Sequence, residues 1–195
     1  MNDMSPINDN ITKPATIVNG INVDDLAALA EMVSNDPDEG MTNWQVTTTW
    51  QGQTRSRSEV KSFGIGGVDV PRHFAFDVDE PTEIGGTNQF ANPQEYLIGA
   101  VNACIMVGYV AQCALRGIEI ESLRIETTGD IDLRGFLGLD PAVANGYEQL
   151  SYRIMVKADA DPETLAEVHE AVKATSPNYF NMANAVTMHS DMVIE

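Results

Sequence analysis

The fold of this chain is decided by Asn92-Pro93-Gln94-Glu95-Tyr96-Leu97-Ile98-Gly99-Ala100-Val101-Asn102-Ala103-Cys104. Asn92 offers a side-chain oxygen as N-cap, and Pro93 suits the first helical position, so a helix is predicted to begin here. The pattern continues to about Arg116 and Gly117, with apolar or small residues on nearly every side. A helix that is apolar all round is a buried one. We therefore predict a buried central helix that carries Cys104.

Strands are predicted on both sides of this helix. Period-two alternation of apolar and polar residues covers 44–50 and 73–78, and residues 54–60 form a polar return strand. After the helix, strands are predicted at 119–127, 150–157 and 185–194, with an amphipathic helix from Asp161 to about 175 and an ordered excursion over 130–149. Strands grouped around helices without strict alternation indicate an α+β fold with antiparallel sheets around the central helix.

The N-terminal part is predicted to be an extension of one main domain. Residues 1–20 are polar and rich in turn signals, which predicts a mobile tail. From Asp24, apolar residues at helical spacing predict a short helix that ends before the breaker at 35–40. We therefore divide the 195 residues into an extension, 1–40, and a main domain, 41–195.

Composition excludes several classes of partner. Eleven basic residues among 29 acidic ones give a formal charge of −18, so no basic surface is available for nucleic acid or for an anionic membrane. No apolar run is expected to reach the length of a membrane span, and Met1 to Thr16 does not resemble a signal peptide. Two cysteines without a secretory signal indicate a reducing compartment, and we expect a cytoplasmic protein.

The order Asn-Pro-x-Glu-x-Leu-x-Gly-Ala, ending in Ala-Cys, resembles the OsmC/Ohr family of osmotically inducible and organic hydroperoxide resistance proteins. The resemblance covers about residues 44–194. It implies an interlocked homodimer, with two central helices sandwiched by sheets and thiol sites at the subunit interface. Small residues on the helix independently favour close approach of another backbone, although a sheet of the same chain is an alternative neighbour: Gly99, Ala100, Ala103, Gly108 and Ala111.

The resemblance also implies that Cys104 is the thiol that reduces organic hydroperoxides. A free thiol has a pKa of about 8.5 and is mostly protonated at neutral pH. Cys104 lies too deep in its helix for the helix dipole to help, so a cation is needed. In the family an arginine of the first hairpin supplies it, which makes Arg55 the first candidate and Arg57 the alternative cation. Both could equally be solvated strand residues.

Two positions depart from the family pattern. The family's glutamate, ten positions before the cysteine, is Gln94 here, and the neighbouring Glu95 points about 180° away from Cys104. The family's resolving cysteine stands in a Cys-Pro step, which is Ser176-Pro177 here. Cys113 cannot take its place, because it lies about 13 Å along the helix from Cys104, whereas bridged cysteines need Cα atoms within about 7 Å.

Two functions remain open. The first is a one-cysteine thiol peroxidase, in which Cys104 reduces an organic hydroperoxide and an external thiol restores it. The second is a non-catalytic OsmC-fold protein that binds an apolar small molecule at the dimer interface, with Cys104 as an inert core residue. Cys113 is predicted to be a small buried hydrophobe. No cofactor or metal is expected, because His73, His169 and His189 show no ligand spacing.

Overall fold

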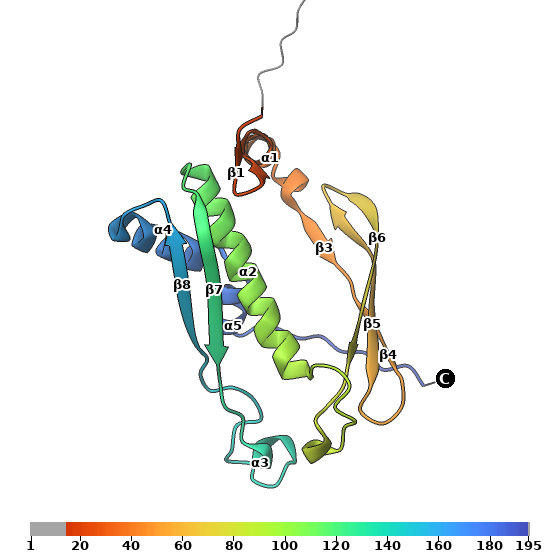
Figure 1. Ribbon diagram of the computed structural model, residues 1–195. Helices are drawn as coiled ribbons and strands as arrows, with labels where there is room; N and C mark the ends of the chain where they lie inside the picture. The colour runs from red at the N-terminus through yellow and green to blue at the C-terminus, as the bar shows by residue number, and fades with distance from the viewer. Residues whose placement is uncertain (1–14, 195) are drawn as a thin grey trace, which may run out of the picture.

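The computed structural model describes residues 15–194 and shows an α+β fold, with a long central helix between two antiparallel sheets (Figure 1). The central helix is α2 (Pro93–Leu115). The first sheet contains β3 (Thr42–Trp44), β4 (Thr47–Trp50), β5 (Ser56–Ile65) and β6 (Val68–Val78). The second contains β7 (Ile120–Thr128) and β8 (Ser151–Ala158), and α4 (Pro162–Thr175) and α5 (Pro177–Ala183) follow it.

Helix α2 begins where the sequence predicts. The Asn92 side chain accepts a hydrogen bond from the Glu95 backbone amide at 2.9 Å, and the Glu95 carboxylate accepts one from the Asn92 amide at 2.7 Å. This reciprocal pair is a capping box, which satisfies two backbone donors that the first helical turn leaves free. The carboxylate of Glu95 is therefore used to start the helix.

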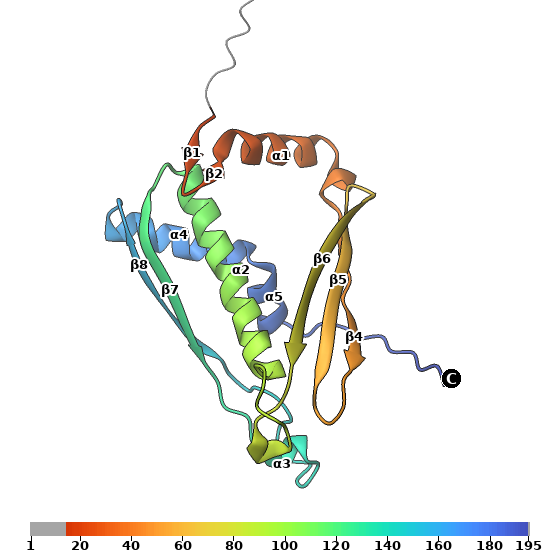
Figure 2. The ribbon, with the colours of Figure 1, turned by 45° about the vertical axis from the view of Figure 1, so that its right-hand side comes forward.

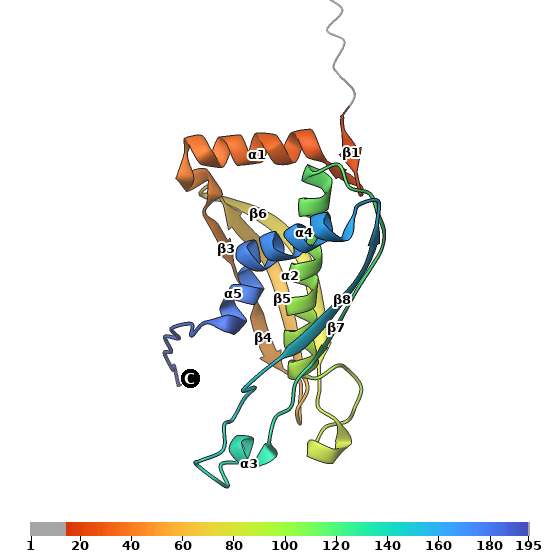
Figure 3. The same ribbon diagram turned by 90° about the vertical axis from the view of Figure 1, so that its left-hand side faces the viewer.

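One face of α2 forms the hydrophobic core. Val101, Ile105, Tyr109 and Cys113 recur every fourth residue and pack with Val168 and Val172 of α4. Figure 3 shows α4 and α5 lying against α2. A Cβ on Gly108 would lie 3.0 Å from Val172 Cγ1, so this glycine allows the close approach of α4.

The opposite face of α2 is open within the chain. Ala103 and Val107 lie on this face and are exposed, Val107 to 68%. The first sheet reaches the helix mainly near Tyr96, whose hydroxyl donates to the Asp77 carbonyl at 2.8 Å and whose ring lies 4.9 Å from that of Phe76. The predicted all-round burial of the helix is thus realised on one side only.

The strand predictions are partly wrong. The strand predicted at 44–50 is divided into β3 and β4, which pair with different parts of β5. The strand predicted at 54–60 begins at Ser56 and continues to Ile65, so Arg55 lies in the preceding turn. No strand forms over 185–194, a segment that is exposed and has no neighbouring strand of its own chain within the described residues. Pairing needs a second strand, which an alternating pattern alone does not supply.

The N-terminal extension is more ordered than predicted. Residues 1–14 of the predicted tail lie outside the described residues, but β1 (Ile17–Val18) and β2 (Ile21–Asn22) form a small hairpin. Its turn residue Asn19, with φ of 51°, donates to the Ile118 carbonyl and accepts from the Ile120 amide, each at 2.8 Å. These bonds fix the hairpin to the start of β7.

The predicted N-terminal helix is present as α1 (Val23–Asn35), capped by Asn22. A 3-10 turn, η1 (Pro37–Gly40), follows it. Figure 2 shows α1 crossing the end of the molecule from the C-terminal end of α2 to the first sheet. The extension therefore spans the two halves of the chain.

Helix α2 also corrects the expectation that no segment has the length of a membrane span. It is 23 residues long, and its mean hydropathy over an 18-residue window is 1.7. Glu95 in the first turn is its one charged residue, and its other polar residues, such as Asn102 and Gln112, are uncharged and spread among apolar ones. By length and composition the helix could cross a membrane, but core helices of water-soluble proteins meet the same criterion. The absence of a membrane partner stays a prediction.

Candidate thiol site

The structure brings Cys104 and Ser176 together. The Ser176 hydroxyl donates a hydrogen bond to Cys104 Sγ at 3.3 Å, across 72 positions of sequence. Cys104 is half-buried, and Ser176 is only 5% exposed. The position of the family's resolving cysteine is therefore in contact with the candidate thiol.

Ser176 is held in place by the junction between two helices. Its amide donates to the Val172 carbonyl at 2.9 Å and so ends α4. Its hydroxyl accepts from the Tyr179 amide at 3.3 Å and so caps α5. The Asn178 side chain adds a bond to the Ala100 carbonyl of α2 at 2.9 Å. The hydroxyl is thus fixed relative to the helix that carries Cys104.

Cys113 lies in the core, as predicted. It is 0% exposed and belongs to the cluster formed by α2 and α4. Burial raises the pKa of the Cys113 thiol. A buried and protonated thiol is a poor nucleophile, so Cys113 fits the role of a small apolar residue.

The two candidate arginines differ in their partners. Arg57 on β5 forms hydrogen bonds of 3.1 and 3.0 Å to both oxygens of Asp77, its cross-strand neighbour on β6. Arg55 donates from Nη2 to the Gln51 carbonyl at 3.3 Å. Its Nε is buried and is the only buried side-chain nitrogen or oxygen in the described part of the chain that lacks a hydrogen-bond partner. Arg55 is therefore the arginine whose guanidinium has no carboxylate partner within the described chain.

Arg55 and Gln94 lie near the N-terminal end of α2, whereas Cys104 lies near its middle. Gln94 is in the first turn of α2, about 15 Å along the axis from Cys104. Arg55 lies in the β4–β5 turn, which is tied to the loop preceding α2 through Thr54 and Asp79. None of the hydrogen bonds or ion pairs among residues 15–194 joins Arg55 or Gln94 to Cys104. A single chain does not assemble the four candidate residues.

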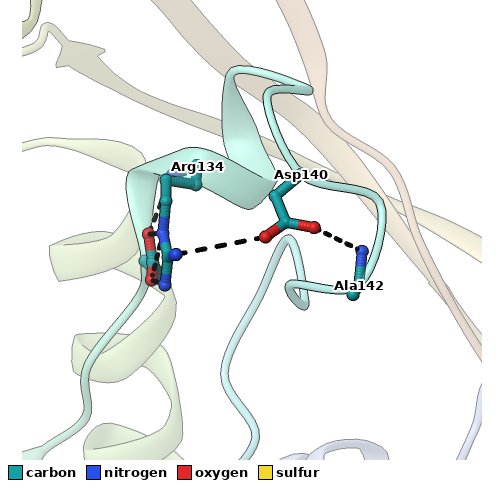
Figure 4. Close-up of polar contacts among 4 residues, drawn as sticks. Arg134, Asp140 and Ala142 are labelled. Atoms are coloured by element: carbon teal, nitrogen blue, oxygen red, sulfur yellow. Dashed lines mark hydrogen bonds and ion pairs between the residues drawn. The ribbon is translucent and has the colours of Figure 1, made fainter.

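Gln94 instead lines a cavity of about 220 Å³ between the loop before α2 and the excursion after β7. The excursion contributes an apolar wall that includes Ile131, Leu133 and Phe136. The short helix α3 (Leu133–Phe136) carries Arg134, which pairs with Asp132 and lies 4.0 Å from Asp140. Asp140 in turn accepts from the Ala142 amide at 3.0 Å (Figure 4). The excursion is thus ordered, as predicted.

A second polar pair connects α2 to α4. The Tyr109 hydroxyl lies 2.5 Å from His169 Nδ1. Burial raises the pKa of Tyr109 to about 12. His169 therefore contacts the core, although the sequence places it on the polar face of its helix. Within residues 15–194 no group of three or more His, Cys, Asp or Glu side chains is arranged to hold a metal ion.

Comparison with known proteins agrees with this architecture. The family model described as OsmC-like protein matches residues 86–191, more than half of the chain. The chain therefore belongs to the OsmC-like protein family.

Individual relatives are distant. An uncharacterized protein of Bacillus subtilis (strain 168), YmaD, is 27% identical over 96 residues, which cover 48% of this chain and 59% of that protein. The match thus spans about three-fifths of the length of this curated relative. An OsmC-like protein from Mycoplasma pneumoniae has a similar structure, with a TM-score of 0.58 and 12% identity, over 73% of this chain and 89% of that one. An OsmC-like protein of unknown function from Vibrio cholerae has a TM-score of 0.50 and 11% identity, over 72% of this chain and 93% of that one. At these identities the likeness shows the fold.

Sequence reasoning missed two groups in this region. The role of Glu95 in the capping box could have been found, because Asn92 followed three residues later by glutamate is the signal for that motif. The buried Asp79 carries no comparable signal. It follows an alternating strand and looks like any loop carboxylate, and only the folded chain shows that it is 0% exposed.

Proposed function

We propose that this protein is a one-cysteine thiol peroxidase that reduces organic hydroperoxides, as a homodimer with two shared sites. Cys104 of one subunit is the reacting thiol, and Arg55 and Gln94 come from the other subunit. An external thiol restores the enzyme. The proposal includes a cytoplasmic location, where such thiols are available and both cysteines stay reduced.

The observation that carries the proposal is the Ser176–Cys104 contact of 3.3 Å. It places a hydrogen-bond donor on the sulfur at the position where the family pattern has its resolving cysteine. Most of the core cluster along α2 is apolar, so a polar side chain directed at this sulfur supports a role for the thiol beyond packing. A cysteine kept only for packing, like Cys113, has no such neighbour.

The placement of the candidate residues along α2 supports a site shared between two subunits. Each chain holds Cys104 near the middle of the helix and holds Arg55 and Gln94 at its N-terminal end. If two α2 helices cross in opposite directions along their open faces, the N-terminal end of each approaches Cys104 of the other. The partnerless Nε of Arg55 then meets an acceptor from the second subunit, and buried polar groups are normally paired in this way.

The proposed reaction has two steps. The Cys104 thiolate attacks one peroxide oxygen, the O–O bond breaks, and the leaving alkoxide takes a proton to become an alcohol, while the sulfur is oxidised to a sulfenic acid. Ser176 cannot form a disulfide with that sulfur. An external thiol therefore condenses with the sulfenic acid to release water, and a second external thiol reduces the mixed disulfide.

The proposal is tested with purified protein and cumene hydroperoxide. We expect one oxygen atom to add to Cys104 before Cys113, dimedone to trap the product, and dithiothreitol to support turnover. Cys104→Ala should abolish all three results, and the matched variant Cys113→Ala should retain them. Equal labelling of the two cysteines in the wild type would instead assign Cys104 to the core.

The second candidate is a binding protein, favoured by an apolar groove along the open face of α2. The groove has a volume of about 740 Å³ and is lined by residues that include Phe76, Leu97, Ala100 and Ala103. Under this alternative, part of the groove stays open beside the second α2 helix, a probe such as 1-anilinonaphthalene-8-sulfonate binds there, and cumene hydroperoxide leaves Cys104 unmodified. The same mass spectra therefore separate the two functions.

A further inference from the structure

We infer that Asp79 is a positioning residue of this thiol site, because it fixes the turn that carries Arg55 against the loop that leads to Gln94. The inference rests on the proposed function, since it concerns how Arg55 is held for Cys104. It adds a residue that neither the sequence pattern nor the family resemblance singles out.

Asp79 is a fully buried carboxylate without a basic partner among the described residues. One oxygen accepts from the Thr54 hydroxyl at 2.7 Å. The other accepts from the Thr87 hydroxyl at 2.5 Å, and from the Thr87 and Gln89 amides at 3.1 Å each. Burial alone raises the pKa of Asp79, but these hydrogen bonds outweigh burial and hold the pKa well below its usual range. The residue is therefore a charged hydrogen-bond acceptor at neutral pH.

The turn that carries Arg55 depends on this carboxylate for its position. Within the turn, the Gln51 amide donates to the Arg55 carbonyl at 2.8 Å and the Arg55 amide to the Gly52 carbonyl at 3.1 Å. In the part of the chain that the structure describes, the bond from Thr54 to Asp79 is the only hydrogen bond from residues 51–55 to a segment outside the β4–β5 hairpin. It is therefore the contact that orients the turn.

The other partners of Asp79 belong to a tightly closed loop. The Asn88 amide donates to the Glu80 carbonyl at 3.0 Å, and a Cβ on Gly86 would overlap that carbonyl. The Asp79 amide donates to the Ala91 carbonyl at 3.3 Å, directly before the N-cap of α2. Asp79 thus connects the Arg55 turn to the start of the helix that carries Gln94.

Asp79 positions the Arg55 turn without pairing with the guanidinium itself. Asp77 pairs directly with the Arg57 guanidinium and holds that side chain against β6 of its own chain. Asp79 acts through the neutral Thr54 hydroxyl instead, and the Arg55 Nε remains without a partner. A guanidinium held in this way remains available to a thiolate.

The test measures the rate of Cys104 alkylation by iodoacetamide as a function of pH, with peptide mapping to separate Cys104 from Cys113. This readout needs no peroxidase turnover. Arg55→Ala should move the rate profile to higher pH, since alkylation slows about tenfold for each pH unit of that displacement. Thr54→Val should move it in the same direction. Adding Thr54→Val to Arg55→Ala should cause no further displacement.

Thr48→Val is the matched control, because Thr48 bonds Ser58 at 2.9 Å in the same hairpin, away from Asp79. It should leave the profile unchanged. Thr54→Val is preferred to a substitution of Asp79, because Asp79 also accepts hydrogen bonds from Thr87 and Gln89 and its loss would destabilise the loop before α2. If Arg55→Ala displaces the profile but Thr54→Val behaves like Thr48→Val, the inference is overturned and the proposed function stands. The inference is likewise overturned if Thr54→Val acts equally with and without Arg55. No effect of Arg55→Ala overturns both.

Discussion

At the scale of the residue, the site combines an available thiol with substitutions at two of the family's positions. Ser176 contacts Cys104 at 3.3 Å, at the position where the family resemblance implies a resolving cysteine. Gln94 can accept a hydrogen bond from a guanidinium but adds no charge to hold it. For the proposed peroxidase, we expect both departures to slow turnover rather than to remove the site.

Restoring the family pattern should therefore raise turnover. Ser176→Cys supplies a resolving thiol beside Cys104, and Gln94→Glu supplies a charge for Arg55. The double variant should form an intramolecular disulfide between positions 104 and 176 and consume cumene hydroperoxide about tenfold faster with a dithiol, which corresponds to about 1.4 kcal/mol in the barrier. Peptide mapping and a peroxide assay check this. A folded double variant without the disulfide would show that the side chains at 104 and 176 do not meet.

Asp79 gives a prediction about pH and stability. Because its pKa is lowered in the folded state, its contribution to stability is complete above the ordinary carboxyl pKa of about 3.9 and is lost as pH falls further. Asp79→Asn should lower the melting temperature at pH 7, and the gap from wild type should narrow at pH 3. Thermal unfolding at the two pH values measures both gaps. A gap that is constant between them would mean that the carboxylate charge contributes nothing.

At the scale of the element, α2 has one face packed by its own chain and one open face. Gly108 lies on the packed side, where Val172 fills the space above it, whereas a Cβ on Gly99 meets nothing within 4 Å. A glycine inside a helix costs about 1 kcal/mol relative to alanine. The proposed dimer explains why a glycine stands at position 99, since a second α2 helix approaches there.

Gly99→Leu should accordingly weaken the dimer without unfolding the chain. The leucine side chain would fill the groove in which the second α2 helix packs. Outside the adjacent turns of α2, no atom of the described chain lies within 4 Å of a Cβ at position 99, so the monomer fold can accommodate the leucine. Sedimentation velocity should show a shift toward monomer at micromolar concentration. Ala166→Leu, on the exposed face of α4, is the control and should remain dimeric. Equal behaviour of the two variants would place the interface elsewhere.

The Tyr109–His169 pair gives a prediction at alkaline pH. Since burial raises the pKa of Tyr109 to about 12, its contribution to stability is complete below the ordinary pKa of about 10 and is lost as pH rises from there toward 12. Tyr109→Phe should cost about 1 kcal/mol at pH 8 through the lost hydrogen bond. Between pH 8 and pH 11 it should then lose less stability than wild type in urea unfolding. A parallel decline in both proteins would contradict this.

Much of the element order follows from local sequence signals, and the errors have a common physical cause. The start of α2 is predictable because capping is local, and the strands predicted at 73–78, 119–127 and 150–157 are present as β6, β7 and β8. The strand predicted at 185–194 fails because strand formation needs a partner strand, which the described chain does not offer there. Asp79 escapes detection for a similar reason, since its burial depends on segments separated from it in sequence.

At the scale of the whole molecule, the first sheet has almost no core of its own. Trp44, Trp50 and Phe74 are 64%, 73% and 59% exposed, and few residues of this sheet are buried. Large aromatic side chains are rarely left so exposed on a stable monomer, and contiguous apolar patches mark interaction surfaces. Together with the open face of α2, this exposure accounts for the proposed dimer.

The most direct test of the shared site is a hybrid dimer of one Cys104→Ala subunit and one Arg55→Ala subunit. Each parent homodimer lacks a complete site. The hybrid regains one if Cys104 and Arg55 come from different subunits, and we predict dimedone trapping at Cys104 at about half the wild-type level after cumene hydroperoxide, because one site in two is intact. A hybrid no more reactive than the Arg55→Ala homodimer would contradict the account.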